Sequence, residues 1–266
     1  PPMLSSAASD WHRRARPCFG TRLVLQVRGP ERLAALRMMG EAFELADRLH
    51  EAMSRQSPGS EVAQLGRLEP GQNLQLTPDT HAVLALALEM AGATDGLFDP
   101  VMPGEGGREA SWRDLALSHS GLVSVTAPLK ISLDGIAKGY AADRLCAFLI
   151  ESGGRDVIID AGGDLALDCR EPQSIGVRDP ARPGQVSGVI EIARGGIATS
   201  GDFGGISDLW RGMSGAGPWR GSVTVQARDG ATADALSKVV GQAGPGYPRL
   251  ARWQARAFAA EDESPE

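Results

Sequence analysis

Short stretches rich in glycine and aspartate are the parts of this sequence best suited to chemistry. Glycine lets backbone N–H groups approach phosphate oxygens closely, and an aspartate can bind a hard cation or a ribose hydroxyl. Taken alone, each stretch is more often a turn than a site. The four stretches are Thr94-Asp95-Gly96-Leu97-Phe98-Asp99-Pro100, Leu133-Asp134-Gly135-Ile136-Ala137-Lys138-Gly139-Tyr140, Asp160-Ala161-Gly162-Gly163-Asp164 and Ala198-Thr199-Ser200-Gly201-Asp202-Phe203.

A fifth stretch, Ala233-Asp234-Ala235-Leu236, places a carboxylate near the start of a predicted helix. There the carboxylate can bind a ligand or simply interact with the helix dipole. No G-x-x-x-x-G-K-[ST] loop is present, and no G-x-G-x-x-G motif follows a strand. The sequence is therefore neither an ordinary P-loop protein nor an ordinary Rossmann protein.

Charge and composition exclude other classes of function. The chain of 266 residues has 27 Lys and Arg against 33 Asp and Glu, which gives a net charge of -6. Because no surplus of cations is available to neutralise phosphates, we expect no nucleic-acid partner. The 3 cysteines make neither a disulfide framework nor a zinc site. No apolar run of about 18 residues or more is present, so we expect no transmembrane segment.

The elements that must position these stretches do not alternate regularly. An apolar stripe predicts a long helix over 31–53, and Thr77 before Pro78 predicts the start of another, which ends before Gly96. Further helices are predicted over 137–151 and 233–240. Strands are predicted over 21–28, 157–159, 175–177, 186–192 and 222–227. This mixture predicts an α+β fold rather than a doubly wound one.

The predicted organisation is one large domain with short extensions. Residues 1–17 are predicted to be a loose N-terminal arm, residues 18–259 the domain, and residues 260–266 an acidic tail. Within the domain, segments 123–125 and 129–133 are predicted to be strands that pair with each other.

In this order the stretches resemble the FAD:protein FMN transferases of the ApbE family, formerly called thiamine biosynthesis lipoproteins. The resemblance covers about Phe19 to Gly241 and adds the matches Phe19-Gly20-Thr21, Met53-Ser54 to Pro58, Ser60-Glu61 and Ala141-Ala142-Asp143. It implies a single α+β domain of the flavin transferase type, with mixed sheets packed against helices.

The resemblance also implies an activity. Members bind FAD as a substrate, use Mg²⁺ to cleave its pyrophosphate, and attach FMN to a Thr or Ser of a target flavoprotein with release of AMP. The family's catalytic positions fall on Lys138 and Asp234, and its magnesium ligands on Gly135, Asp234 and Ser237. The family's flavin and nucleotide contacts fall on Phe19, Gln56, Leu97, Phe98, Asp99, Ser132, Asp134, Lys138, Asp160, Gly162, Gly163, Ser200, Gly201 and Asp202.

Several of these positions depart from the family pattern. Gln56 stands where the family has a Tyr against the flavin, so a stacking face is lost. Ser132 stands in place of a nucleotide-contacting Asp. Asp134, two residues on, compensates if the segment is a strand but not if it is a turn. Gly205 stands in place of a His that contacts FAD.

The fourth departure concerns the metal. Lys238 replaces a Thr hydroxyl of the family's magnesium site, and an ammonium group cannot ligate a cation. One interpretation places the Lys238 ammonium in the cation's position, paired with Asp234 at i, i+4 spacing. In the other, Lys238 points to solvent and water fills the coordination sphere. We expect the first, so Mg²⁺ as a cofactor is in question.

Two functional hypotheses follow. The first, which the retained Gly/Asp framework favours, is an active FAD:protein FMN transferase. The alternative is a catalytically impaired paralogue that binds FAD or a partner protein without transfer, because Gln56, Ser132, Gly205 and Lys238 depart together. The resemblance favours a periplasmic or membrane-anchored protein. A cytoplasmic location stays open because no lipid-bearing N-terminal Cys is present.

Overall fold

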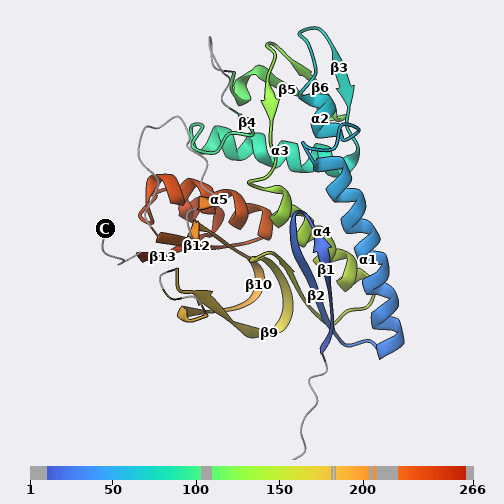
Figure 1. Ribbon diagram of the computed structural model, residues 1–266, viewed down its shortest axis with the longest axis vertical. Helices are drawn as coiled ribbons and strands as arrows, with labels where there is room; N and C mark the ends of the chain where they lie inside the picture. The colour runs from blue at the N-terminus through green and yellow to red at the C-terminus, as the bar shows by residue number, and fades with distance from the viewer. Residues whose placement is uncertain are drawn as a thin grey trace, which may run out of the picture.

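A curved antiparallel sheet forms the base of the molecule (Figure 1). The computed structural model describes residues 11–102, 110–180, 182, 184–203, 206–207 and 221–261. The strand order is β1-β2-β8-β9-β10-β12-β13, and β11 pairs with β10. The strands are β1 (Trp11–Cys18), β2 (Thr21–Arg28), β8 (Asp156–Ala161), β9 (Asp164–Arg178), β10 (Val186–Phe203), β11 (Ile206–Ser207), β12 (Gly221–Ala227) and β13 (Arg256–Glu261).

Helices α4 (Ala137–Glu151) and α5 (Gly230–Ala243) cover one face of this sheet. Helix α4 lies over β8 and β9, and α5 lies over β10 and β12. The long helix α1 (Arg32–Met53) runs beside α4. The main core lies between these helices and the sheet and extends into residues 76–131. A smaller apolar cluster lies on β8, β9 and β10.

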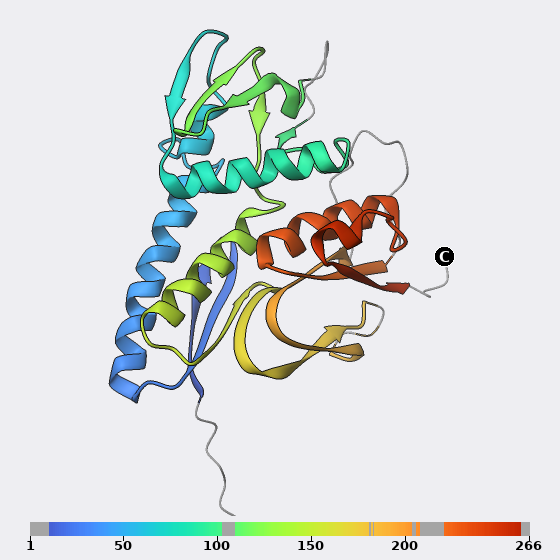
Figure 2. The same cartoon turned by 180° about the vertical axis from the view of Figure 1, so that it is seen from behind.

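Helix α3 (Pro78–Ala93) separates the large sheet from a smaller region, as both views show (Figure 2). That region holds a three-stranded sheet in the order β3-β6-β5 and a two-stranded sheet of β4 and β7. Its elements are α2 (Glu61–Leu65), β3 (Asn73–Gln75), β4 (Val101–Met102), a 3-10 turn (Trp112–Asp114), β5 (Leu115–Leu117), β6 (Leu122–Val125) and β7 (Lys130–Ile131). A second 3-10 turn (Leu250–Trp253) precedes β13.

The helix predictions are confirmed by the structure. The apolar stripe of 31–53 becomes α1, whose buried face includes Met39, Phe43 and Leu49. Pro78 is the first residue of α3, and α4 ends just before Gly153. The predicted short helix over 233–240 is longer, since α5 starts at Gly230 behind the capping side chain of Asp229. The α+β fold class is confirmed.

The structure corrects two predictions, one about the N-terminal arm and one about a pair of strands. Residues 11–17 are not part of a loose arm, because they form β1 and pair with β2 over its whole length, from Trp11 with Arg28 to Cys18 with Thr21. Their polar, arginine-rich sequence reflects an edge strand with an exposed face. Segments 123–125 and 129–133 do not pair with each other, since β6 pairs with β3 and β5 while β7 pairs with β4. Residues 1–10 and 262–266 lie outside the described residues.

Candidate functional site

A cavity of about 630 Å³ opens where the β1–β2 turn, the end of α1, the start of α4 and the β8–β9 turn meet. Thr199 of β10 and Lys238 of α5 complete its wall. A cavity of this volume is within the range of small-molecule sites. Of the site residues predicted from the sequence, the cavity is lined by Phe19, Gln56, Asp134, Gly135, Lys138 and Gly162.

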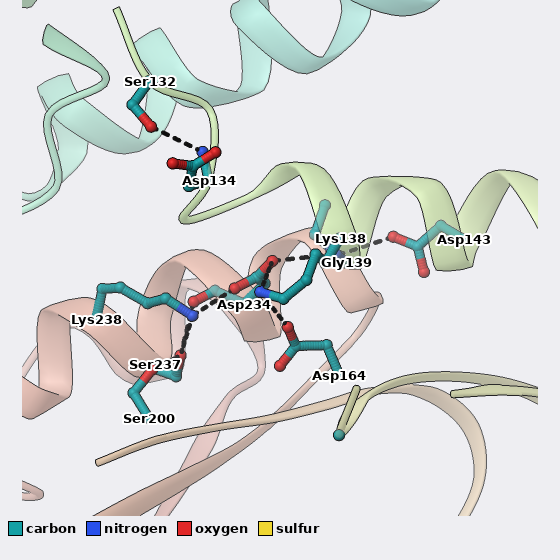
Figure 3. A network of polar contacts seen from close by, with 12 residues as sticks. Ser132, Asp134, Lys138, Gly139, Asp143, Asp164, Ser200, Asp234, Ser237 and Lys238 are labelled. Atoms are coloured by element: carbon teal, nitrogen blue, oxygen red, sulfur yellow. Dashed lines mark hydrogen bonds and ion pairs between the residues drawn. The ribbon is translucent and has the colours of Figure 1, made fainter. Parts of the chain in front are cut away.

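Two lysines and two aspartates form a charged cluster at this cavity (Figure 3). The Lys138 ammonium lies 2.7 Å from Asp164 Oδ2 and 3.9 Å from Asp234 Oδ2. The Lys238 ammonium lies 2.6 Å from Asp234 Oδ1. Asp234 therefore stands between the two lysines, which reach it from α4 and from its own helix α5.

Backbone contacts hold Asp234 in this place. Its Oδ2 accepts a hydrogen bond of 3.0 Å from the backbone N–H of Gly139, in the first turn of α4. The helices touch here, because a Cβ added at Gly139 would lie 2.2 Å from the carbonyl oxygen of Gly230. Only glycine permits that approach, so the Lys-Gly-Tyr sequence at the start of α4 brings Lys138 beside Asp234.

The pKa values of the two carboxylates in the cluster are shifted in opposite directions. Burial by itself raises the pKa of Asp234, but the ammonium groups of Lys138 and Lys238 outweigh burial and hold that pKa below its usual value. Burial raises the pKa of Asp164, and the charge of Asp234 raises it further against the pull of the two lysines. Of the two carboxylates, Asp234 is therefore the one whose ionised form the surroundings favour more strongly.

A smaller hollow of about 40 Å³ lies on the other side of Lys238. Asp99 is bound to its own loop, because it accepts hydrogen bonds from the backbone N–H groups of Val101 at 2.8 Å and Trp112 at 3.1 Å. Burial raises the pKa of Asp99 despite those bonds. The predicted contacts that line this hollow rather than the main cavity are Leu97, Phe98, Asp99 and Ser132.

Asp134 does not take over the place of Ser132. Strand β7 ends at Ile131, so both residues lie beyond it, Asp134 in a turn. The Asp134 carboxylate is exposed, pairs with Arg55 Nε at 3.0 Å, and lines the main cavity. Ser132 Oγ accepts from the Asp134 N–H at 3.2 Å and faces the smaller hollow. Of the two alternatives, the turn is confirmed.

The β8–β9 turn supplies a second backbone wall. Asp160 Oδ1 accepts from the Gly163 N–H at 2.8 Å, so this carboxylate shapes the turn. Gly162 has φ +72, and a Cβ there would lie 2.3 Å from Thr21 Oγ1. Gly162 is therefore required by the close approach of this turn to the β1–β2 turn.

The predicted contacts on β10 lie behind the cluster. Ser200 Oγ is buried 2.7 Å from Ser237 Oγ, which in turn donates to the carbonyl oxygen of Asp234 at 2.7 Å. Gly201 pairs with Ser222 of β12 through the backbone. The backbone of Asp202 pairs with Ser207, and its side chain lies outside the described residues, as does Gly205.

The residues present do not fit a magnesium ion at the predicted ligands Gly135, Asp234 and Ser237. The predicted i, i+4 pairing of Lys238 with Asp234 is confirmed, and that ammonium stands 2.6 Å from the carboxylate oxygen and 3.3 Å from Ser237 Oγ. Both Asp234 oxygens are thus already bound by cationic or backbone donors. In the described part of the chain, no group of three or more His, Cys, Asp or Glu side chains is placed to hold a metal ion.

Some cavity residues were missed from the sequence. The His50 ring packs edge-on against Phe19 with 5.2 Å between centroids, and Phe19 has φ 53 at the β1–β2 turn. Thr199 and Arg55 also line the cavity. His50 lies one turn before Met53 near the end of α1, so its place in the helix is its only sequence signal.

The chain is similar to proteins of one known family. The model of the ApbE family matches residues 19–104 and 106–259. A curated relative from Rhodobacter capsulatus, an FAD:protein FMN transferase, is 27% identical over an alignment 277 residues long. The alignment includes 88% of this chain and 52% of the relative. The chain thus spans about half the length of that curated relative.

Solved structures share the fold. The apo form of the flavinyl transferase ApbE from Pseudomonas stutzeri superposes with a TM-score of 0.78 at 18% identity, covering 93% of this chain and 91% of that one. The ApbE protein from Thermotoga maritima superposes with a TM-score of 0.72 at 24% identity, covering 86% and 85%. The flavin transferase ApbE from Vibrio cholerae gives 0.76 at 20% identity, covering 94% and 93%.

Proposed function

Since the chain belongs to the ApbE family, we propose that it binds FAD in the main cavity and transfers FMN from it to a Thr or Ser of a target flavoprotein, releasing AMP. The observation that carries the proposal is the pair of ammonium groups, Lys138 and Lys238, on the wall of a cavity of about 630 Å³. The curated relative's activity as an FAD:protein FMN transferase supports it. We further propose that residues 18–259 form the transferase unit.

The reaction makes modest demands on the protein. The acceptor hydroxyl oxygen bonds to the phosphorus of the FMN half while the bond from that phosphorus to the bridging oxygen breaks. AMP leaves with the bridging oxygen, and the hydroxyl proton is lost. Phosphoryl transfer of this kind depends on positioning and on charge stabilisation rather than on covalent work by the enzyme.

Different residues of the cavity would position the substrate and stabilise its charge. Lys138 and Lys238 supply positive charge for the pyrophosphate. Asp164 holds the ammonium group of Lys138, and Asp234 holds that of Lys238. Gly162 and Gly135 line the cavity, where their backbone would lie beside a bound ligand. The paired rings of Phe19 and His50 offer an apolar surface for the flavin. A target Thr or Ser would enter at the open mouth, where Arg55 and Asp134 are exposed.

The alternative function is FAD binding without transfer. The specific observation in its favour is the ion pair of Lys238 with Asp234, which occupies the predicted metal position. Gln56, on the cavity wall, also offers no aromatic face to a flavin. The two functions share the binding step and differ in the release of AMP.

Calorimetric titration with FAD, FMN and AMP tests the binding step, and chromatographic detection of AMP tests transfer. We expect FAD to bind more tightly than either half, because the proposal places the ammonium groups against the pyrophosphate that joins the two halves. Lys138→Met should weaken FAD binding by roughly tenfold, the scale of one charge-assisted hydrogen bond. Lys130→Met is the matched control, since Lys130 is exposed on β7 and away from the cavity.

Binding with AMP release would establish the transferase, and binding without AMP release would favour the alternative. Folded protein that binds no flavin nucleotide would refute both. Where the protein acts is a separate matter. Among the described residues, no helix combines the length and the apolar character needed to cross a membrane.

A further inference from the structure

We propose that the ammonium group of Lys238 is a built-in cation that replaces a divalent metal in this cavity, so that a nucleotide pyrophosphate binds here without any metal ion. The inference rests on the proposed function for the identity of the ligand. Its geometric part, the exclusion of a divalent cation, stands on the residues alone.

The first argument is the position of the ammonium. Lys238 Nζ lies 2.6 Å from Asp234 Oδ1 and 3.3 Å from Ser237 Oγ, and the Lys238 side chain is only 11% exposed. These two oxygens are the kind that a hard cation binds, and they converge on the nitrogen. The ammonium thus occupies the point from which a cation would contact them.

Secondly, both carboxylate oxygens of Asp234 already have partners. Its Oδ2 accepts from the Gly139 N–H at 3.0 Å and faces the Lys138 ammonium at 3.9 Å. A divalent ion at Oδ1 would have to displace Lys238, and it would then stand close to the positive charge of Lys138. Repulsion between like charges in a buried site opposes that exchange strongly.

The third argument is that the lysine stem is fixed. A Cβ added at Gly135 would lie 3.7 Å from Lys238 Cγ and 3.2 Å from the Phe98 ring, so the stem runs through a narrow gap beside Gly135. The Gln242 side-chain N–H donates to the Lys238 carbonyl oxygen at 3.2 Å and to the Leu97 carbonyl oxygen at 3.0 Å. These contacts direct the ammonium toward Asp234.

Finally, both cations of the cluster are lysines, although most cationic residues of the chain are arginines. The chain's 27 cationic residues include 3 lysines, Lys130, Lys138 and Lys238, and the other 24 are arginines. Two of the 3 lysines belong to this cluster. An ammonium group resembles a bound metal ion in that its charge is compact, and its donors point in several directions. The charge of a guanidinium group is instead spread over a flat fork. The cluster therefore uses the side chain that best imitates a small cation.

Metal binding is tested first without flavin. Free Mn²⁺, followed by its electron paramagnetic resonance signal, reports binding of a divalent ion to the intact protein. We expect no bound Mn²⁺ in the wild-type protein. We expect Lys238→Thr to bind Mn²⁺, because the threonine hydroxyl adds an oxygen and frees Asp234 Oδ1. Lys238→Met is the matched control, since it removes the charge without adding an oxygen, and it should bind at least tenfold more weakly than Lys238→Thr.

Flavin binding is then measured in EDTA and in excess Mg²⁺. We expect the dissociation constant of FAD to change by less than twofold in the wild-type protein. A tenfold or larger gain from Mg²⁺, or wild-type binding of Mn²⁺ as tight as that of Lys238→Thr, would overturn the inference. Wild-type protein that binds neither Mn²⁺ nor FAD would refute the proposed function while the exclusion of the metal stands. If Lys238→Thr does not fold, the two wild-type measurements still decide.

Discussion

Two aspartates, the buried Asp234 and the partly buried Asp143, lie at the contact of α4 with α5, and their surroundings differ. Asp234 of α5 accepts from the Gly139 N–H in the first turn of α4. Asp143 of α4 accepts from the N–H groups of Gly230 and Ala231 in the first turn of α5, at 2.7 and 2.8 Å. Each helix therefore carries the carboxylate that caps the other.

The two carboxylates nevertheless have opposite pKa shifts. Burial raises the pKa of Asp143 to about 7, since the nearby charges of Asp229 and Asp234 add to burial and outweigh its two backbone hydrogen bonds. The pKa of Asp234 is lowered despite burial, because the ammonium groups of Lys138 and Lys238 stand beside it. Capping a helix therefore does not by itself hold down the pKa of an aspartate that lies away from solvent, whereas a neighbouring ammonium group does.

Asp234→Asn should give the largest effect. It removes the negative charge between two ammonium groups, of which Lys238 is 11% exposed. Loss of one partner of a buried ion pair costs about 3–5 kcal/mol of unfolding free energy. Urea denaturation at neutral pH measures this loss. A loss below about 1 kcal/mol would show that the lysines do not depend on Asp234.

Gly139→Ala attacks the helix contact that both aspartates share. The new Cβ would lie 2.2 Å from the Gly230 carbonyl oxygen and 2.8 Å from Asp234 Cβ, so α4 and α5 must separate. We expect a loss of roughly 3 kcal/mol in unfolding free energy from overpacking. Gly246→Ala is the control, because its Cβ would meet nothing within 4 Å. Equal losses in the two variants would mean that the close contact is not required.

Asp143→Asn tests the second aspartate and should cost less. One of its two backbone hydrogen bonds is lost, because the amide nitrogen is a donor facing the Ala231 N–H. An unsatisfied buried donor costs about 1–3 kcal/mol. The same urea denaturation measures the loss, and a loss as large as that of Asp234→Asn would contradict the contrast between the two sites.

Asp143 also predicts a pH dependence of stability. An acid whose pKa is higher in the folded protein binds more protons when folded, so the stability it contributes is present at low pH and is lost as pH rises. For Asp143 the loss spans the interval from its ordinary value of 3.8 to about 7. Asp143→Asn should flatten the stability curve in that interval. An unchanged slope would refute the assignment. Asp234, whose pKa is lowered, contributes stability that disappears as pH falls through that lowered pKa.

Asp229 gives the smallest effect and separates capping from charge. Its side chain caps α5 by accepting from the Thr232 N–H at 2.7 Å, and its charge helps to raise the pKa of Asp143. Asp229→Ala should cost about 1 kcal/mol from the lost cap. Asp229→Ser keeps a capping oxygen, so the stability should change by less than about 0.5 kcal/mol.

The dependence of stability on pH separates the effect of the Asp229 charge from the effect of its helix cap. In Asp229→Ser the upper end of the pH-dependent interval should move below about 7, because one of the charges that raise the pKa of Asp143 is gone. A profile identical to that of the wild-type protein would show that the charge of Asp229 does not contribute to the raised pKa of Asp143.

Much of the site was predictable because it depends on local sequence. The i, i+4 spacing of Asp234 and Lys238 places both on one face of any helix, so their ion pair follows from the sequence. The position of Asp134 in a turn was one of two alternatives, and the end of β7 at Ile131 decided it. The partner of the predicted strand 123–125 was wrong, because strand partners depend on contacts between distant segments.

The sequence alone determined the helices, the α+β class and the glycine and aspartate framework of the family, since periodicity and close backbone approach leave local signals. Tertiary structure decided which framework residues share a cavity. It placed Asp99 and Ser132 at a separate hollow and made Asp143 a cap of α5. The reason is physical: burial and the nearest charges, which set the state of each aspartate, come from segments far apart in the chain.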